Sequence, residues 1–268
     1  MRLFLTLAIT LLFAFAAPVR AQLAPPNDAG LTFAHVHLNV ADIEVHKRLW
    51  VEHFGGVVAE KGPLSTVKLP NMLIVFTERA PSGPSQGTAM DHFGFKVRDI
   101  EPVLARWRAA GLEVQSEFTG AEGHPNAYLL APDGVRFELQ EDPTMTLETI
   151  GYHIHYWSRD FESLMAWYAD VFGATVRQRG TIRTTADVPG MNLSFANCPN
   201  ECAPTVGRAI DHVGFEIDDL EAFAARLQAR GIEFQVAPRY IESIGLTIAF
   251  LTDPAGVRIE LTEGFDEY

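Results

Sequence analysis

Six of the nine histidines occur at spacings suited to metal binding or proton transfer. They are His35, His37, His92, His153, His155 and His212. Two pairs, His35 with His37 and His153 with His155, are separated by one residue, so in a strand both members of a pair would lie on the same face. Imidazole is the commonest metal ligand and also titrates close to neutral pH. The pattern therefore indicates two strands that each present a pair of reactive side chains.

These histidines belong to a repeat that spans most of the chain. Residues 90–101 recur at 210–221, residues 35–37 recur at 153–155, and residues 134–139 recur at 256–261. The spacing between copies drifts slowly, as small loop insertions produce. We therefore expect two homologous domains at 31–143 and 150–264, joined by a linker near Pro143.

Each domain is itself expected to contain two similar units. Alternating apolar residues predict strands, helical spacing predicts helices, and glycine marks the helix ends. In the first domain the predicted strands are 31–40, 56–60, 64–69, 72–77, 91–97, 112–117, 126–131 and 135–140, and the predicted helices are 44–54 and 99–110. The whole chain is thus an α+β protein of four βαβββ units.

Three motifs, each present twice, resemble the vicinal oxygen chelate superfamily. They are His-x-His before a helix, Asp-His-x-Gly-Phe before a second helix, and Pro-x-Gly-Val-Arg-x-Glu-Leu near the end of each domain. That superfamily includes glyoxalase I, type I extradiol ring-cleavage dioxygenases, fosfomycin-modifying enzymes and bleomycin-binding proteins. The resemblance implies two tandem half-barrel domains, in which paired units form a cup that holds a metal.

The resemblance also implies a set of metal ligands in each domain. They are His35, His92 and Glu138 in the first domain and His153, His212 and Glu260 in the second. Residues 73–76 and 192–195 lack the carboxylate that glyoxalase-like members place there, which disfavours a four-ligand glyoxalase site. Two imidazoles and one carboxylate suit Fe(II) or Mn(II), while Zn(II) or Ni(II) would be tolerated. The alternative is that the histidines are buried strand residues of a metal-free binding cup.

Other polar residues are expected to line these cups. His37 and His155 would line the pocket, support the ligands, or replace His35 and His153 as ligands. His124, Asn126 and Tyr128 share a strand face in the first domain, where the second domain has Leu246, Ile248 and Phe250.

The polar residues of this strand favour the first domain as the reactive one. Tyr128 would orient or protonate a substrate, and His124 would act as an acid–base group. An edge strand with polar residues facing solvent is the alternative.

The N-terminus and the cysteines indicate export. Residues 1–21 combine Arg2, an apolar run and small residues at Val19 and Ala21, which is typical of a signal peptide cleaved after Ala21 and predicts a periplasmic or secreted protein. A membrane anchor is the rival interpretation, but a spanning helix needs about 20 apolar residues. Cys198 and Cys202 favour a small disulfide loop in an oxidising compartment, with free thiols or a metal pair as alternatives.

Composition and missing motifs exclude several function classes. The net charge of −13 argues against nucleic acid as a partner, and neither a phosphate-binding glycine loop nor a Gly-x-Ser-x-Gly motif is present. We expect a small-molecule substrate, no membrane contact after signal cleavage, and a monomer or homodimer.

Two classes of function remain. The first is a metal-dependent enzyme acting on vicinal oxygens, with extradiol ring cleavage as its sharpest version and a lyase, isomerase or epimerase as its runner-up. The second is a non-catalytic small-molecule binding protein that resembles the bleomycin-binding members.

Overall fold

The computed structural model describes residues 23–265 of the chain. The expected signal peptide, residues 1–21, lies outside the described residues. Within the described part, no helix combines the length and the apolar character needed to cross a bilayer.

The described residues form four consecutive βαβββ units, as the sequence predicts. The first unit contains β1 (Leu31–Val40), α1 (Ile43–Phe54), β2 (Val57–Lys61), β3 (Leu64–Leu69) and β4 (Met72–Glu78). The second contains β5 (Met90–Val97), α2 (Ile100–Ala109), β6 (Glu113–Thr119), β7 (Pro125–Ala131), a 3₁₀ turn η1 (Pro132–Gly134) and β8 (Val135–Glu141). The third contains β9 (Thr149–Ser158), α3 (Phe161–Phe172), β10 (Thr175–Arg179), β11 (Ile182–Val188) and β12 (Met191–Asn197). The fourth contains β13 (Ile210–Ile217), α4 (Leu220–Ala229), β14 (Val236–Ile241), β15 (Leu246–Thr252) and β16 (Arg258–Glu263).

Each of these helices begins after an aspartate. The side chains of Asp42, Asp99, Asp160 and Asp219 accept hydrogen bonds from backbone N–H groups of the first turn. Such caps satisfy donors that have no partner inside the helix. The same local signal in all four units explains why the strand–helix boundaries could be predicted closely.

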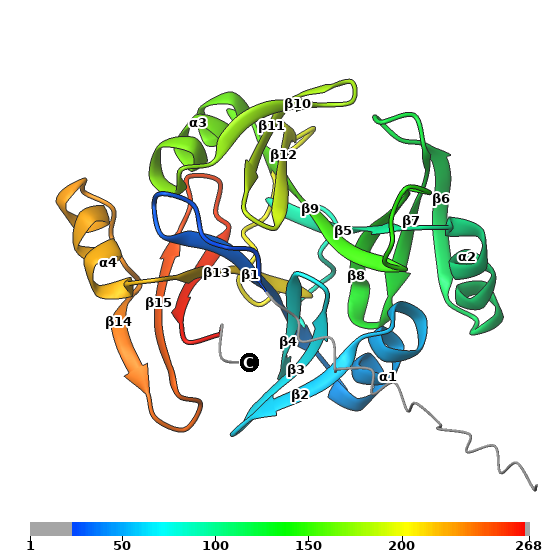
Figure 1. Ribbon diagram of the computed structural model, residues 1–268, viewed down its shortest axis with the longest axis horizontal. Helices are drawn as coiled ribbons and strands as arrows, with labels where there is room; N and C mark the ends of the chain where they lie inside the picture. Colours follow the sequence, from blue (N-terminus) through cyan, green and yellow to red (C-terminus); the bar gives the residue numbers. More distant parts are fainter. Residues whose placement is uncertain (1–22, 266–268) are drawn as a thin grey trace, which may run out of the picture.

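The strands form two eight-stranded sheets, each built from two units that are not in the same half of the chain (Figure 1). One sheet has the order β14-β15-β16-β13-β1-β4-β3-β2 and combines the first and fourth units. We call it the terminal cup. The other has the order β10-β11-β12-β9-β5-β8-β7-β6 and combines the second and third units. We call it the central cup.

This pairing corrects the expectation that each domain closes its own cup. β1 pairs with β13 and β5 pairs with β9, in both cases antiparallel. The two units of one half instead associate through their apolar outer faces. Trp50 of α1 packs against Phe93, Phe95 and Phe137 of the second unit, with ring centroids 5.2–6.0 Å apart. The alternation of residues predicts which face of a strand is buried, but the four similar first strands do not reveal which two will pair.

Each sheet curls until its outermost hairpins meet. Thr181, in the β10–β11 turn, donates from its backbone N–H to the Ala121 carbonyl beyond β6, at 3.0 Å. In the terminal cup, a Cβ added to Gly62 would lie 2.0 Å from the Ser243 carbonyl oxygen, so the β2–β3 and β14–β15 turns are in contact. The inward faces of β1, β5, β9 and β13 are thereby enclosed.

Candidate metal centres

The central cup brings together two histidines and a glutamate. Nε2 of His92 on β5 lies 3.2 Å from Oε2 of Glu138 on β8, and Nε2 of His153 on β9 lies 3.3 Å from the same oxygen. All three residues are buried. Asn126 of β7 donates from Nδ2 to the other carboxylate oxygen, Oε1, of Glu138. One oxygen of Glu138 therefore remains directed at both imidazoles.

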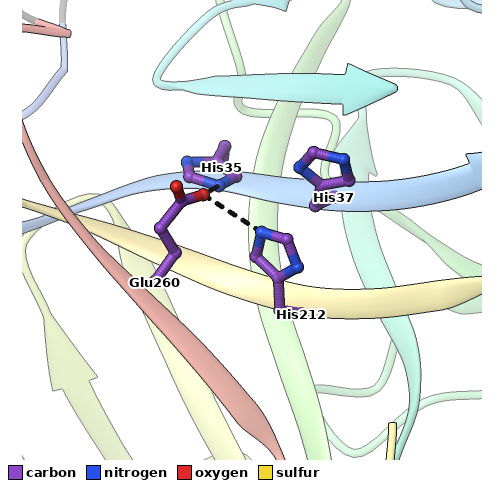
Figure 2. Close-up of side chains that lie close together, drawn as sticks. All are labelled: His35, His37, His212 and Glu260. Atoms are coloured by element: carbon purple, nitrogen blue, oxygen red, sulfur yellow. Dashed lines mark hydrogen bonds and ion pairs between the residues drawn. The ribbon is translucent and has the colours of Figure 1, made fainter. Parts of the chain in front are cut away.

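The terminal cup repeats this arrangement with equivalent residues (Figure 2). Nε2 of His35 and Nε2 of His212 each lie 3.0 Å from Oε2 of Glu260. His37 lies beside this group, with its ring stacked on that of His212 at a centroid distance of 4.3 Å. Candidate ligand atoms of His35, His37, His212 and Glu260 all lie within 4.8 Å of one another, as do those of His92, Glu138 and His153.

A glycine on the neighbouring strand makes room for one histidine in each cup. A Cβ added to Gly94 would lie 2.1 Å from Cε1 of His153, and one added to Gly214 would lie 1.9 Å from Cε1 of His35. Glycine inside a strand commonly marks such a close approach. The glycine of the Asp-His-x-Gly-Phe motif therefore leaves the space in which His153 reaches Glu138 and His35 reaches Glu260.

The spacing of the donor atoms fits a single divalent ion. Metal–N and metal–O bonds to first-row ions are about 2.0–2.2 Å long, so adjacent ligand atoms lie about 3.0 Å apart at a right angle and about 3.4 Å apart at a tetrahedral angle. The observed separations between imidazole nitrogen and carboxylate oxygen are 3.0–3.3 Å. Both clusters thus have the dimensions of a metal site.

The protonation states of the cluster also call for a cation between its members. Nδ1 of His92 lies against Oδ1 of Asp91, and Nδ1 of His212 lies 2.6 Å from Oδ1 of Asp211. An ionised aspartate accepts hydrogen bonds only, so Nδ1 carries the proton and Nε2 of the neutral ring has a lone pair. That lone pair faces a glutamate oxygen, and the repulsion between them is relieved by a proton or a metal ion.

Burial and charge shift the pKa values of these groups in a consistent way. Burial alone would raise the pKa of Glu138, but His153 and His92 hold it well below its usual range, and His212 and His35 do the same for Glu260. Burial would lower the pKa of His92, but Asp91 and Glu138 outweigh it and raise the pKa. For His153, burial dominates and lowers the pKa to about 4. The glutamates are therefore ionised and His153 is neutral at neutral pH, which are the forms that bind metals, whereas the raised pKa of His92 favours a proton that a bound ion would displace.

The positions beside the first-strand histidines carry no carboxylate in either cup. β4 places Leu73 beside His35 and Val75 beside His37, while β12 places Asn192 beside His153 and Ser194 beside His155. The described structure therefore agrees with the sequence in lacking the fourth, carboxylate ligand of a glyoxalase-like site.

A cavity of about 480 Å³ lies on the central-cup side of the molecule. Its walls include Asp91, Tyr128, Arg136, Trp157 and the loop 198–202. Cys198 and Cys202 are disulfide-bonded, which confirms the favoured interpretation of this pair. The loop that they close therefore forms a cross-linked wall of the cavity.

Tyr128 connects this cavity with the metal-binding cluster. It pairs with Glu138 across β7 and β8, and its ring lies 5.1 Å from that of His92. Burial and the charge of Glu138 raise the pKa of its phenol, so the group stays protonated at neutral pH. The guanidinium carbon of Arg136 lies 3.7 Å from the centre of the Tyr128 ring.

The structure separates the other predicted site residues. The ring centroids of His37 and His212 are 4.3 Å apart, and those of His155 and His92 are 4.7 Å apart. His124 precedes β7 in a turn where its carbonyl accepts the Gly120 N–H. Among the described residues, the groups that could hold a metal do not include His124.

The grouping of the ligands differs from the predicted one. His35 was predicted to join His92 and Glu138 but lies with His212 and Glu260. His153 was predicted to join His212 and Glu260 but lies with His92 and Glu138. The six residues are those expected, but His35 and His153 are exchanged between the clusters. The reason is that β1 pairs with β13 and β5 pairs with β9, across the two halves of the chain.

The residues that hold these candidate ligands were not predicted from the sequence. Asp91 accepts hydrogen bonds from Nε1 of Trp157 and Nη1 of Arg136, at 2.8 and 2.9 Å. Asp211 accepts from Nδ2 of Asn39 and Nη1 of Arg258, at 3.0 and 3.2 Å. The repeat offered a signal for them. An aspartate directly precedes both His92 and His212, and an arginine lies two residues before both Glu138 and Glu260.

Comparisons with known proteins place the chain in a family. The model of the Glyoxalase/Bleomycin resistance protein/Dioxygenase superfamily matches residues 32–139 and 152–261. A comparison with curated protein sequences finds no match.

Solved structures share the fold at low identity. Glyoxalase I from Zea mays gives a TM-score of 0.71 at 17% identity, covering 88% of this chain and 94% of that one. A candidate dioxygenase from Bacillus subtilis subsp. subtilis str. 168 gives 0.63 at 10% identity, covering 91% of this chain and 86% of that one. Because the family model matches two segments that together span most of the sequence, the chain belongs to the Glyoxalase/Bleomycin resistance protein/Dioxygenase superfamily.

Proposed function

We propose that the protein is a divalent-metal-dependent enzyme whose reactive centre is the central cup. The substrate class is a small molecule with two adjacent oxygens, and extradiol cleavage of a catechol-like ring is the sharpest form of the proposal. The observation that carries it is the convergence of His92, His153 and Glu138 next to Tyr128 and a cavity.

Three protein ligands suit this chemistry because they leave coordination positions for a substrate and for O₂. Two imidazoles and one carboxylate with open positions are the donor set of non-haem Fe(II) oxygenases. An ion held there would act as a Lewis acid that polarises and orients the two substrate oxygens. The missing fourth carboxylate beside His153 disfavours a glyoxalase-like centre.

The chain's own residues would orient the substrate. Tyr128 keeps its proton, so its phenol can donate a hydrogen bond to a substrate oxygen near His92. Arg136 is held between Asp91 and the face of the Tyr128 ring. It therefore keeps that ring in position and cannot readily serve as a free cation for an anionic substrate.

Metal content and oxygen consumption test the proposal together. Protein purified without oxygen should contain Fe or Mn bound by the central cup, and it should consume O₂ when a catechol is added. Glu138→Gln should lose this ion and at least 100-fold in rate, because the carboxylate that both imidazoles face is gone. Glu260→Gln is the matched variant and should keep the rate, since it alters only the terminal cup.

The alternative outcomes are specific. A Glu138→Gln protein that retains its central-cup ion would contradict the site. A protein that binds no metal, yet binds apolar compounds tightly in the cavity near Tyr128, would instead be a binding module.

We further propose that the protein is exported and acts as a monomer or simple homodimer. The apolar N-terminal segment supports export, and a disulfide between Cys198 and Cys202 is compatible with an oxidising compartment. N-terminal sequencing of the mature protein should begin at Gln22. Light scattering on the same sample would give the oligomeric state.

A further inference from the structure

The terminal cup has an apolar interior where the central cup has a polar one. Its inward-facing side chains form a buried cluster of Leu73, Val75, Leu246, Ile248, Phe250 and Phe265. At matching register positions the central cup has Asn192, Ser194, Asn126 and Tyr128. The two metal-binding clusters therefore lie in different surroundings, although their ligands are equivalent.

The segment after β16 lies across the terminal cluster. The Phe265 ring is 5.3 Å from the His35 ring, and Phe265 is only 3% exposed. Glu216 holds this segment through Oε1, which accepts the backbone N–H groups of Gly264 and Phe265 at 2.6 and 2.9 Å. An aromatic side chain of the protein thus covers the first-strand histidine on which the cluster depends.

The terminal cup also offers one more donor than the central cluster. His37 belongs to the group formed with His35, His212 and Glu260, whereas His155 does not join His92, Glu138 and His153 but forms a separate group with Asp91 and His92. Nε2 of His37 lies 2.7 Å from Oγ1 of Thr77. If Nε2 donates to this hydroxyl, Nδ1 has a lone pair, and Nδ1 is buried without a hydrogen-bond partner among the described residues.

We propose that the terminal cup holds a four-ligand metal site with a structural function, distinct from the three-ligand centre in the central cup. Three imidazoles and one carboxylate bind a divalent ion of the zinc type, and Phe265 packs over the His35 ring. Closed four-ligand sites are typical of structural zinc, whereas catalytic sites keep a position open. The terminal cup therefore exchanges its ion more slowly than the central cup does.

Release of Zn(II) from the full chain tests this proposal. Apo-protein reloaded with Zn(II) is freed of excess metal and mixed with a chromogenic chelator. We expect two ions per chain, released in two phases whose rates differ at least tenfold. Glu138→Gln should remove the fast phase and Glu260→Gln the slow one.

The contributions of Phe265 and of the fourth donor, His37, are tested in the Glu138→Gln background, where only the terminal ion remains. Phe265→Ala should accelerate release at least tenfold, and Tyr240→Ala, which removes a 64%-exposed ring from the same sheet, should not. His37→Gln should also accelerate release, while His155→Gln, its counterpart in the central cup, should have no effect. Circular dichroism checks that each variant is folded, and Glu216→Gln replaces Phe265→Ala if that protein does not fold.

Two results would overturn the proposal. One is a slow phase that survives Glu260→Gln, or that is absent from the wild-type protein. The other is a release rate that neither Phe265→Ala, or its replacement Glu216→Gln, nor His37→Gln changes. Loss of the fast phase alone concerns only the central cup, so failure of the proposed enzymatic function would be seen separately.

Discussion

At the scale of single residues, Asp91 determines how His92 presents itself to a ligand. Its carboxylate accepts a hydrogen bond from Nδ1 and is itself held by Arg136 and Trp157. Burial would raise the pKa of Asp91, but His92 lowers it to about 2, so it remains an acceptor at neutral pH. An aspartate in this position orients the imidazole and increases its basicity toward a metal.

Asp91→Asn should therefore weaken metal binding in the central cup by about 10- to 100-fold. The neutral amide is a weaker acceptor for His92 and presents an N–H group toward Arg136. Competition with a chelating dye measures the affinity of each site. Asp211→Asn is the matched variant and should weaken the terminal site only; equal effects of both variants on both ions would contradict the assignment.

At the scale of elements, two strands owe their function to a missing side chain. Gly94 in β5 and Gly214 in β13 leave space for an imidazole from the adjacent strand. Any larger residue would displace that ring from its glutamate. Overpacking of a buried site typically costs about 1–3 kcal/mol.

Gly94→Ala should lower the metal affinity of the central cup at least tenfold and lower the melting temperature. The reason is that its Cβ would overlap the His153 ring. Gly214→Ala should have the same effect on the terminal cup through His35. Metal content and thermal denaturation of both variants check this, and an unchanged metal content in either protein would show that its ring can relocate.

The turn between β15 and β16 contains a buried carboxyl group. Oδ1 of Asp253 accepts the backbone N–H groups of Ala255 and Val257, and Oδ2 accepts the Tyr168 hydroxyl at 2.9 Å. Burial raises the pKa of Asp253 from 3.8 to about 6 despite these hydrogen bonds. The folded state therefore binds a proton more tightly here than the unfolded state does.

This group should make the protein less stable as the pH rises. Between about pH 4 and pH 6 the folded chain keeps the proton and the unfolded chain has lost it, so rising pH favours unfolding, by at most about 3 kcal/mol. Above pH 6 the contribution is constant. Asp253→Asn should abolish it, and denaturant unfolding of metal-free wild-type and variant protein from pH 4 to 7.5 measures the difference. Parallel stability profiles for the two proteins would rule out the shifted pKa.

At the scale of the whole molecule, each metal-binding cluster depends on both halves of the chain. His92 and Glu138 come from the first half and His153 from the second, while Glu260 and His212 come from the second half and His35 from the first. Strand pairing across the halves is the cause.

His153→Gln should therefore remove the central ion and leave the terminal one, although His153 lies in the other half of the sequence from Glu138. His35→Gln should do the reverse. Each variant is made in the Glu260→Gln and Glu138→Gln backgrounds, in which only the central or only the terminal site is intact. Metal analysis then distinguishes the observed grouping from one in which each half of the chain supplies a whole site. Loss of the central ion in His35→Gln would contradict the observed pairing.

The sequence predicts the elements and the ligand residues better than it predicts their grouping. Helical spacing, glycines at the helix ends and period-two alternation are local signals, so the units were found within a few residues. The repeat identified all six residues that the two clusters bring together. The partner of each first strand was not predictable, because β1, β5, β9 and β13 carry similar patterns and alternation does not encode which two will pair. The position of His124 outside β7 likewise depends on a turn whose geometry the pattern did not reveal.

The reciprocal pairing of strands has a consequence for how such a duplicated chain can diversify. A tandem copy ordinarily allows one repeat to drift while the other keeps its task. In this chain neither repeat can diverge independently, because each repeat supplies one wall of both cups. Divergence must instead occur between the two cups. The second and third units have polar inner walls, and the first and fourth have apolar ones. Laboratory recombination should therefore exchange units in those pairs, since replacing one repeat with a copy of the other would combine a polar wall with an apolar one in each cup.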